Sequence, residues 1–156
     1  MEIQEIYDRQ YSRIYRVAML YLKNVADAED AVQIVFIRFI EKKIKFTDRS
    51  HEDGWFITAT KNYCKDVLKT FWKRKIELGE LPEMATEFEN DRGLLEKILK
   101  LSVKYREVLY LYYYEEYSVR EISKILNRKE STIQTQLSEA RKKLKKYIIK
   151  EDECNE

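Results

Sequence analysis

Turn-forming residues are scarce in this sequence, which has three glycines and one proline among its 156 residues. Sheets built from tight hairpins need residues that adopt positive φ at their turns, so the composition excludes a fold rich in hairpins. Leucine, lysine, glutamate and arginine are plentiful, and all four favour helices. The sequence therefore predicts an all-α protein.

Residues suited to covalent or metal chemistry are also scarce, with two cysteines and one histidine. Cys64 lies in an apolar helical pattern and Cys154 in an acidic tail, which excludes a disulfide framework or a paired metal-ligand spacing. His51 stands alone in a polar segment, without a glycine-rich phosphate loop or a nucleophile–base pair elsewhere in the sequence. We therefore predict no metal, no cofactor and no enzymatic activity.

Long apolar runs are missing as well. No run approaches the roughly 20 residues that span a bilayer, and the first ten residues, MEIQEIYDRQ, lack the apolar core of a signal peptide. We expect a cytoplasmic protein without membrane insertion.

The net charge of +2 would by itself argue against a nucleic-acid partner, but the charges are segregated along the chain. Residues 61–76 contain six basic side chains and one acidic, and residues 137–150 repeat that ratio. Residues 77–92 contain six acidic side chains and one basic. Acidic segments between basic ones let a chain present electropositive patches while it stays soluble.

The acidic stretch 77–92 also holds the one proline and few periodic apolar residues. We therefore interpret 77–92 as a linker between two domains, 1–76 and 93–150, followed by an acidic tail at 151–156.

Two helices are predicted early in the N-terminal half, over residues 2–22 and 27–44, the second with Asp27 as its N-cap. The second has an apolar core stripe of Ala28, Ala31, Val32, Val35, Phe36 and Phe39. Its opposite face holds Asp30, Gln33, Ile34, Ile37 and Glu41. Two isoleucines among hydrogen-bond acceptors fit either packing against another helix of the domain or a docking surface for a basic partner.

A third helix is predicted to begin after Ser50, which has capping-box spacing to Asp53. Its apolar face comprises Phe56, Thr60, Tyr63, Val67 and Phe71. Lysines recur every four residues on the other face, at Lys61, Lys65, Lys69 and Lys73, beside Asn62, Trp55 and Trp72. Like charges at this spacing repel, so the row indicates a solvated lysine face or a polyanion partner. The interleaved aromatic and amide groups favour a nucleic acid.

A helix-turn-helix is predicted in the C-terminal half. A helix over Leu94–Leu101 precedes a break at Ser102, and Ser118 and Glu121 then form a capping box. Asn127 can adopt the left-handed conformation that ends a helix, and a new helix follows with Ile133, Leu137, Ala140 and Leu144 inward.

Two helices joined by three or four residues form either this DNA-binding motif or a plain helical hairpin. The outward side chains of the second helix favour DNA, because they pass from base readers to phosphate binders: Gln134, Thr135, Ser138, Glu139, Arg141 and Lys142. The run Tyr112–Tyr114 is assigned to the core.

Three segments, residues 27–38, 54–69 and 104–146, resemble regions 2 and 4 of bacterial sigma-70 family factors. The small two-domain kind, called extracytoplasmic-function or group IV, is the most similar. The resemblance covers nearly the whole chain outside the linker and the tail.

For residues 1–76, the resemblance implies sigma region 2. The docking site for the β′ coiled coil of core RNA polymerase would be formed by Asp30, Gln33, Ile34, Ile37 and Glu41. A pocket for a flipped base of the minus-10 element would use Phe46, Asn62 and Asp66. The strand backbones would lie along Trp55, Lys61, Lys65, Lys69 and Lys73.

For residues 93–150, the resemblance implies sigma region 4, which also contacts the β flap of the polymerase. The minus-35 bases would be read by Gln134, Thr135, Ser138 and Glu139. Phosphates would be held by Lys129, Thr132, Gln136, Arg141 and Lys142. An anti-sigma factor would cover the same surfaces, and the free protein is expected to be a monomer.

Family members often carry Lys or Arg where this chain has Gln134 and Gln136. Because Gln prefers adenine and Glu accepts from cytosine N4, we expect a hexamer that differs from a G-rich family consensus. The alternative function is a stand-alone helix-turn-helix regulator, which would need an apolar dimer seam or a ligand pocket in its N-terminal half.

Overall fold

The computed structural model describes residues 3–77 and 97–154. The chain divides into two compact units, Met1–Phe88 and Glu89–Glu156. No strand occurs in the two described ranges, and the predicted all-α fold class is confirmed. The predicted linker lies, apart from Glu77, outside the described residues, so its boundaries stay predictions.

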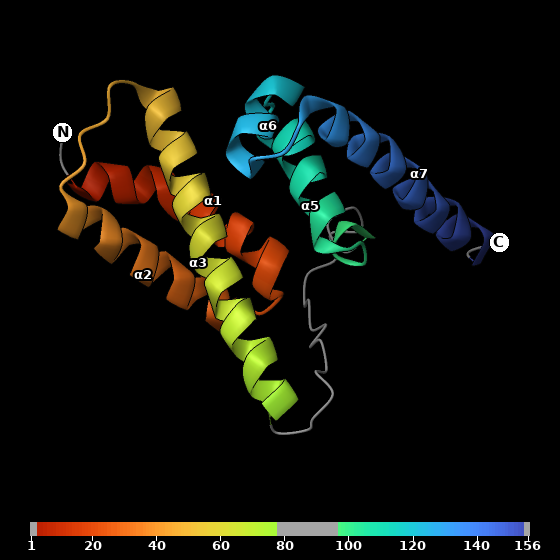
Figure 1. Cartoon of the computed structure of the whole chain (residues 1–156), viewed down its shortest axis with the longest axis horizontal. Helices are drawn as coiled ribbons and strands as arrows, with labels where there is room; N and C mark the ends of the chain where they lie inside the picture. Colours follow the sequence, from red (N-terminus) through yellow and green to blue (C-terminus); the bar gives the residue numbers. More distant parts are fainter. Residues whose placement is uncertain (1–2, 78–96, 155–156) are drawn as a thin grey trace. The chain divides into compact units, whose positions relative to one another are not determined.

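Unit 1 is built from α1 (Ile3–Leu22), α2 (Val25–Lys42) and the long α3 (Arg49–Glu77), with α1 packed against both other helices (Figure 1). The two predicted caps are wrong. Asn24, not Asp27, caps α2, because its Oδ1 accepts from the Asp27 backbone N–H over 3.0 Å. Ser50 lies inside α3, and Asp48 Oδ1 accepts from the His51 backbone N–H over 2.8 Å.

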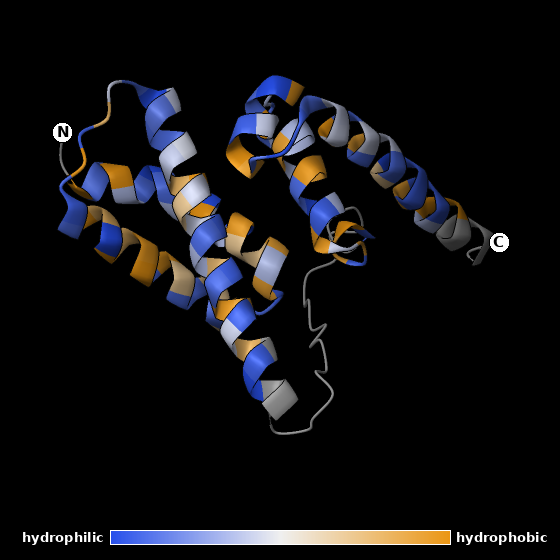
Figure 2. Cartoon of the chain, in the orientation of Figure 1, coloured by the Kyte–Doolittle hydropathy of each residue, from blue (hydrophilic) through white to orange (hydrophobic). Residues whose placement is uncertain are grey.

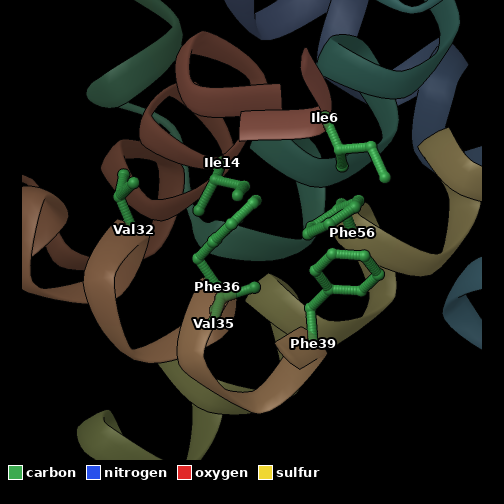
Figure 3. Close-up of a cluster of buried hydrophobic side chains, with 7 residues drawn as sticks. All are labelled: Ile6, Ile14, Val32, Val35, Phe36, Phe39 and Phe56. Atoms are coloured by element: carbon green, nitrogen blue, oxygen red, sulfur yellow. The ribbon is translucent and has the colours of Figure 1, made fainter. Parts of the chain in front are cut away.

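The core of unit 1 is formed by aliphatic and aromatic side chains that lie together (Figure 3). Seven buried side chains form its central cluster: Ile6 and Ile14 of α1, Val32, Val35, Phe36 and Phe39 of α2, and Phe56 of α3. The ring centroids of Phe39 and Phe56 lie 5.2 Å apart. All six predicted core residues of α2 are buried, which confirms that stripe.

A buried polar cluster joins α1 to the start of α3. Glu52 is 1% exposed, and its carboxylate accepts from Arg9 Nη2 and from Gln10 Nε2, each over 2.6 Å. Arg13 Nη1 donates to Asp53 Oδ1 over 2.9 Å. Because breaking a buried pair is costly, this cluster fixes the first turn of α3 on α1.

Unit 2 contains a helical turn at residues 97–99, then α5 (Val103–Leu109), the π-helix η1 (Tyr110–Tyr114), α6 (Val119–Leu126) and α7 (Glu130–Cys154). Both α5 and α6 pack on α7. Apolar and polar bands alternate along α7, as expected of a helix with one buried face (Figure 2).

The predicted helix-turn-helix is confirmed between α6 and α7. Ser118 and Glu121 form the capping box, since each side chain accepts from the other residue's backbone N–H. Asn127 has φ of 55° and ends α6 in the left-handed conformation. Ile133, Leu137 and Ala140 of α7 are buried.

The assignment of Tyr112–Tyr114 to the core is wrong. Tyr113 and Tyr114 are 57% and 58% exposed, whereas Tyr110 is buried. A π-helix bonds each N–H to the fifth residue before it, as Glu115 N–H does to the Tyr110 carbonyl over 3.1 Å. The wider turn changes which positions face inward, so a period of 3.6 residues misplaces this segment.

None of the helices formed by residues 3–77 and 97–154 has the length and apolar character needed to cross a bilayer.

Candidate nucleic-acid interface

One exposed stripe runs along α3. Its residues are spaced three, four or seven apart, so they share one side of the helix: Asn62, Lys65, Asp66, Lys69 and Lys73. The stripe extends about 16 Å, at 1.5 Å of rise per residue. It therefore brings five of the predicted minus-10 residues together, with three cations beside one amide and one carboxylate.

Lys61 differs from this expectation. It is only 8% exposed, so it does not belong to the exposed lysine stripe. The reason is packing. Both α1 and α2 contact α3, so the buried face of α3 is wider than the single apolar stripe that the sequence predicts. Conversely, Phe71, predicted on the apolar face, is 41% exposed near the end of α3.

An aromatic cluster covers the first turns of α3. Phe46 is half-buried in the loop before the helix and stacks on Phe39 with ring centroids 5.5 Å apart. Its ring also meets that of His51 edge-on at 5.2 Å and lies 6.1 Å from Trp55. His51 Nδ1 accepts from the Thr47 backbone N–H over 3.2 Å, so His51 ties this loop to α3.

The three residues predicted to form one base pocket do not share one turn. Phe46 packs against the turn that carries His51 and Trp55, and Asn62 follows Trp55 by seven residues. That separation is about 10 Å along the helix axis. The structure brings Asn62 and Asp66 together, four residues apart on the exposed stripe, and sets Phe46 nearer the start of the helix.

The outer face of α2 carries exposed isoleucines. Ile37 is 51% exposed, so packing within the unit does not account for it, whereas Ile34 is half-buried. Ile40, which sequence reasoning missed, is 44% exposed one turn further on. The remaining predicted docking residues, Asp30, Gln33 and Glu41, are all exposed.

The polar side of α7 is exposed, as predicted. Six predicted contact residues are exposed on this helix, namely Gln134, Thr135, Ser138, Glu139, Arg141 and Lys142. Lys129, just before the helix, is also exposed, and Thr132 and Gln136 are half-buried. The residue types and the helix position are those of a recognition helix that enters the major groove.

Arg128, in the turn before α7, fixes one of these side chains. Its Nη2 donates to Glu107 Oε1 over 2.7 Å, and its Nη1 donates to Gln136 Oε1 over 3.1 Å. Since an arginine only donates, the Gln136 oxygen faces inward and its amide N–H groups are left for an acceptor such as a phosphate. Glu107 lies 29 residues before Gln136, so no periodicity could have revealed this arrangement.

Tyrosine side chains contact two further residues of α7, Glu139 and Arg141. Tyr105 of α5 donates from its hydroxyl to Glu139 Oε2 over 2.7 Å. The Arg141 guanidinium lies over the rings of Tyr112 and Tyr113, at 5.4 and 5.5 Å, and its Nε donates to the Tyr113 hydroxyl. Arg141 also lines an apolar cavity of about 330 Å³ with Ile98, Leu109, Tyr113, Leu144, Lys145 and Ile148.

Groups suited to catalysis are not assembled in the described residues. Within 3–77 and 97–154, no three His, Cys, Asp or Glu side chains cluster to hold a metal ion. Cys64 is fully buried, as its apolar surroundings in the sequence predicted, and burial raises the pKa of its thiol to about 12. That thiol stays protonated near neutral pH and is a poor nucleophile.

These features define a class of protein. One helical unit carries a helix-turn-helix with a polar recognition helix, and the other carries a cationic stripe and an exposed apolar face. A helix-turn-helix in one unit and a cationic stripe in the other are typical of a DNA-binding transcription factor.

The family follows from the sequence patterns that the chain matches. Sigma-70 region 2 matches residues 6–74, and Sigma-70, region 4 matches residues 91–144. The two matches together cover most of the chain. The chain belongs to the sigma-70 family, as a factor of the extracytoplasmic-function type that serves promoter-specific transcription initiation.

Curated relatives are similar in sequence to this chain over most of their lengths. ECF RNA polymerase sigma factor SigW of Bacillus subtilis (strain 168) is 29% identical over 163 residues, which cover 92% of this chain and 87% of SigW. SigM of the same organism is 29% identical, with 93% and 94% covered. SigX is 26% identical, with 93% and 82% covered.

A solved structure has the same fold. It is the sigma factor RpoE in complex with the anti-sigma factor NepR from Bartonella quintana, and its sigma chain is 21% identical to this one. The TM-score is 0.70, with 88% of this chain and 90% of that chain covered.

Proposed function

We propose that this sigma factor binds core RNA polymerase through the outer face of α2. The observation that carries the proposal is the exposed pair Ile37 and Ile40, 51% and 44% exposed, with Asp30 and Glu41 exposed on the same helix. An apolar patch rimmed by polar side chains is typical of a protein–protein contact. The acidic rim suits a basic partner surface, such as the β′ coiled coil that the family resemblance implies.

The exposed stripe of α3 contacts the minus-10 element. Its lysines lie against the phosphate backbone, because each neutralised phosphate releases counterions. Asn62 and Asp66 read an unpaired base through its hydrogen-bonding edge, and half-buried Trp55 offers an aromatic edge to the same strand. The Lys61 side chain is largely covered, so Lys61 contributes to this face as part of the helix and not through a contact with the strand.

The exposed side of α7 contacts the minus-35 element in the major groove. Gln134, Thr135, Ser138 and Glu139 reach base edges, while Lys129 and Lys142 contact phosphates. Thr132 and Gln136 donate to phosphates from half-buried positions. Arg141 contacts a phosphate only with the part of its guanidinium that the tyrosines leave open.

The protein has no chemistry of its own and acts in the cytoplasm, where polymerase and chromosome are found. The β flap docks on unit 2, and the apolar cavity beside Tyr113 offers a suitable surface. An anti-sigma factor inhibits the protein by covering these surfaces; the shared fold with a sigma factor solved in complex with NepR supports this partner.

A matched pair of exposed isoleucines tests the docking face. Ile37→Asp and Ile3→Asp change residues that are 51% and 50% exposed in the same unit, so their effects on folding should be alike. Ile37→Asp should weaken association with purified core polymerase about tenfold or more, as expected for a residue at the centre of an interface. Ile3→Asp should leave association unchanged. Equal association of the two variants would contradict the proposal.

A further inference from the structure

One hydrogen bond connects the interior of unit 2 with the exposed side of α7. Tyr105 is 6% exposed, and its hydroxyl donates to Oε2 of Glu139 over 2.7 Å. Glu139 is exposed and shares its side of the helix with Thr135 and Lys142. An exposed glutamate has many rotamers available, whereas packing holds the Tyr105 ring in one place. The bond therefore fixes the position of the Glu139 carboxylate.

The Tyr105 ring also contacts a cation about one helical turn further along α7. Lys143 Nζ lies 5.3 Å from the ring centroid. Lys143 follows Glu139 by four residues, the spacing at which these two side chains pair on a helix surface. Tyr105 thus contacts both side chains. The hydrogen bond to Glu139 also raises the pKa of the Tyr105 phenol, so the hydroxyl stays protonated and keeps donating near neutral pH.

A carboxylate whose one oxygen already accepts from a buried hydroxyl presents its other oxygen as the more accessible acceptor. In the major groove, the donors are the amino groups of cytosine N4 and adenine N6. Adenine places the acceptor N7 beside its amino group, where it repels a carboxylate, whereas cytosine N4 has no such acceptor on the same base. A fixed Glu139 is therefore selective for cytosine.

We infer that Tyr105 is a positioning residue for promoter reading, which holds Glu139 so that α7 selects cytosine at one base pair of the upstream element. This inference rests on the proposed function, because it requires α7 to lie in the major groove of promoter DNA. Tyr105 itself does not touch the DNA.

The test uses the full chain with core polymerase and a promoter library that is randomised over the upstream element, and reads base preferences from the sequenced transcripts. Tyr105→Phe removes the hydroxyl and keeps the ring. Tyr110→Phe is the matched control, since the Tyr110 hydroxyl donates to Glu115 Oε2 over 3.0 Å and Glu115 is not on α7.

The wild type should prefer cytosine at one position, and Glu139→Ala should abolish that preference. Tyr105→Phe should lower the preference about three- to tenfold, part of the discrimination that one good base contact supplies, and leave all other positions unchanged. Tyr110→Phe should match the wild type. In the Glu139→Ala background, Tyr105→Phe should have no further effect.

An unchanged cytosine preference in Tyr105→Phe would overturn the inference while leaving the proposed function intact. A loss of preference spread evenly over all positions would overturn it as well, because a merely structural tyrosine would act in that way. If no upstream sequence were selected with the wild type, the proposed function and the inference would fall together.

Discussion

Arg128 and Glu107 form an ion pair that ties the turn of the helix-turn-helix to α5. The distance from Arg128 Nη2 to Glu107 Oε1 is 2.7 Å, and the Glu107 side chain is only 2% exposed. The same arginine reaches Gln136 on α7. One side chain thus links α5, the turn and α7, and it engages the oxygen of the Gln136 amide.

Replacement of Arg128 should destabilise unit 2. Arg128→Ala leaves the Glu107 carboxylate buried without this partner, and breaking a buried pair costs about 3 kcal/mol. Urea unfolding of the full chain, with hydrogen exchange followed over residues 103–149, measures the loss. Arg120→Ala, an exposed arginine of α6, should change stability by less than about 0.5 kcal/mol. Equal stability of the two variants would contradict the role given to the pair.

Two serines at helix starts should differ in their contribution. Ser118 accepts from the Glu121 backbone N–H, so Ser118→Ala should lower the free energy of unfolding of unit 2 by about 1 kcal/mol. Ser102 is the N-cap of α5 without a side-chain capping bond, so Ser102→Ala should cost much less. Thermal unfolding of both variants, followed by circular dichroism, compares them. A larger loss for Ser102→Ala would show that the capping geometry is not as described.

The stability of unit 1 should fall in acid through Glu52. Burial raises the pKa of this carboxyl, but hydrogen bonds from Arg9 and Gln10 and the charges of Arg9 and Arg49 lower it by more, so it lies below the ordinary 4.5. A lowered folded-state pKa stabilises the fold above the ordinary value, and this contribution disappears as the pH falls from 4.5 through the folded-state pKa.

Glu52→Gln provides the comparison. It should be less stable than the wild type near neutral pH, and the difference should shrink below pH 4.5 as the wild-type carboxylate takes up a proton. Urea midpoints measured over a pH series test this. A difference that stayed constant down to about pH 2 would mean that the Glu52 charge does not stabilise unit 1.

Local patterns predicted the architecture well where a helix is regular and its buried face is apolar. The apolar stripe of α2, the Ser118 capping box and the left-handed Asn127 are all as the sequence predicts. Lys61 and Tyr113 were misplaced for two different physical reasons. Lys61 lies on a helix that contacts two other helices, and Tyr113 lies in a π-helix. Neither feature can be predicted from a hydrophobic period of 3.6 residues.

The same distinction applies to the candidate site: helical spacing predicted part of it, and tertiary packing decided the rest. Asn62 and Lys69 lie on one exposed face because helical spacing alone requires it. The contacts behind the recognition helix could not be predicted, since Tyr105 is separated from Glu139 by 34 residues in sequence. Only the packing of α5 on α7 brings these two side chains together.

Asn62 should matter for promoter opening and not for polymerase binding. Asn62→Ala removes an exposed amide from α3, so we expect about tenfold fewer open complexes, the loss of one good base contact. Permanganate reactivity of unpaired thymines measures opening, and pull-down measures association. Asp30→Lys should show the reverse pattern. Equal loss of both activities in Asn62→Ala would contradict the assignment of promoter opening to α3 and of polymerase binding to α2.

Transcription with purified components tests the central claim most directly. Core polymerase and a library of promoter fragments are incubated with and without the full chain, and the 5′ ends of run-off transcripts are sequenced. We predict discrete start sites that depend on the added chain and share a minus-10 and a minus-35 element. Transcripts no different from those of core polymerase alone, together with tight binding of the free chain to duplex DNA, would contradict the claim and indicate a stand-alone regulator.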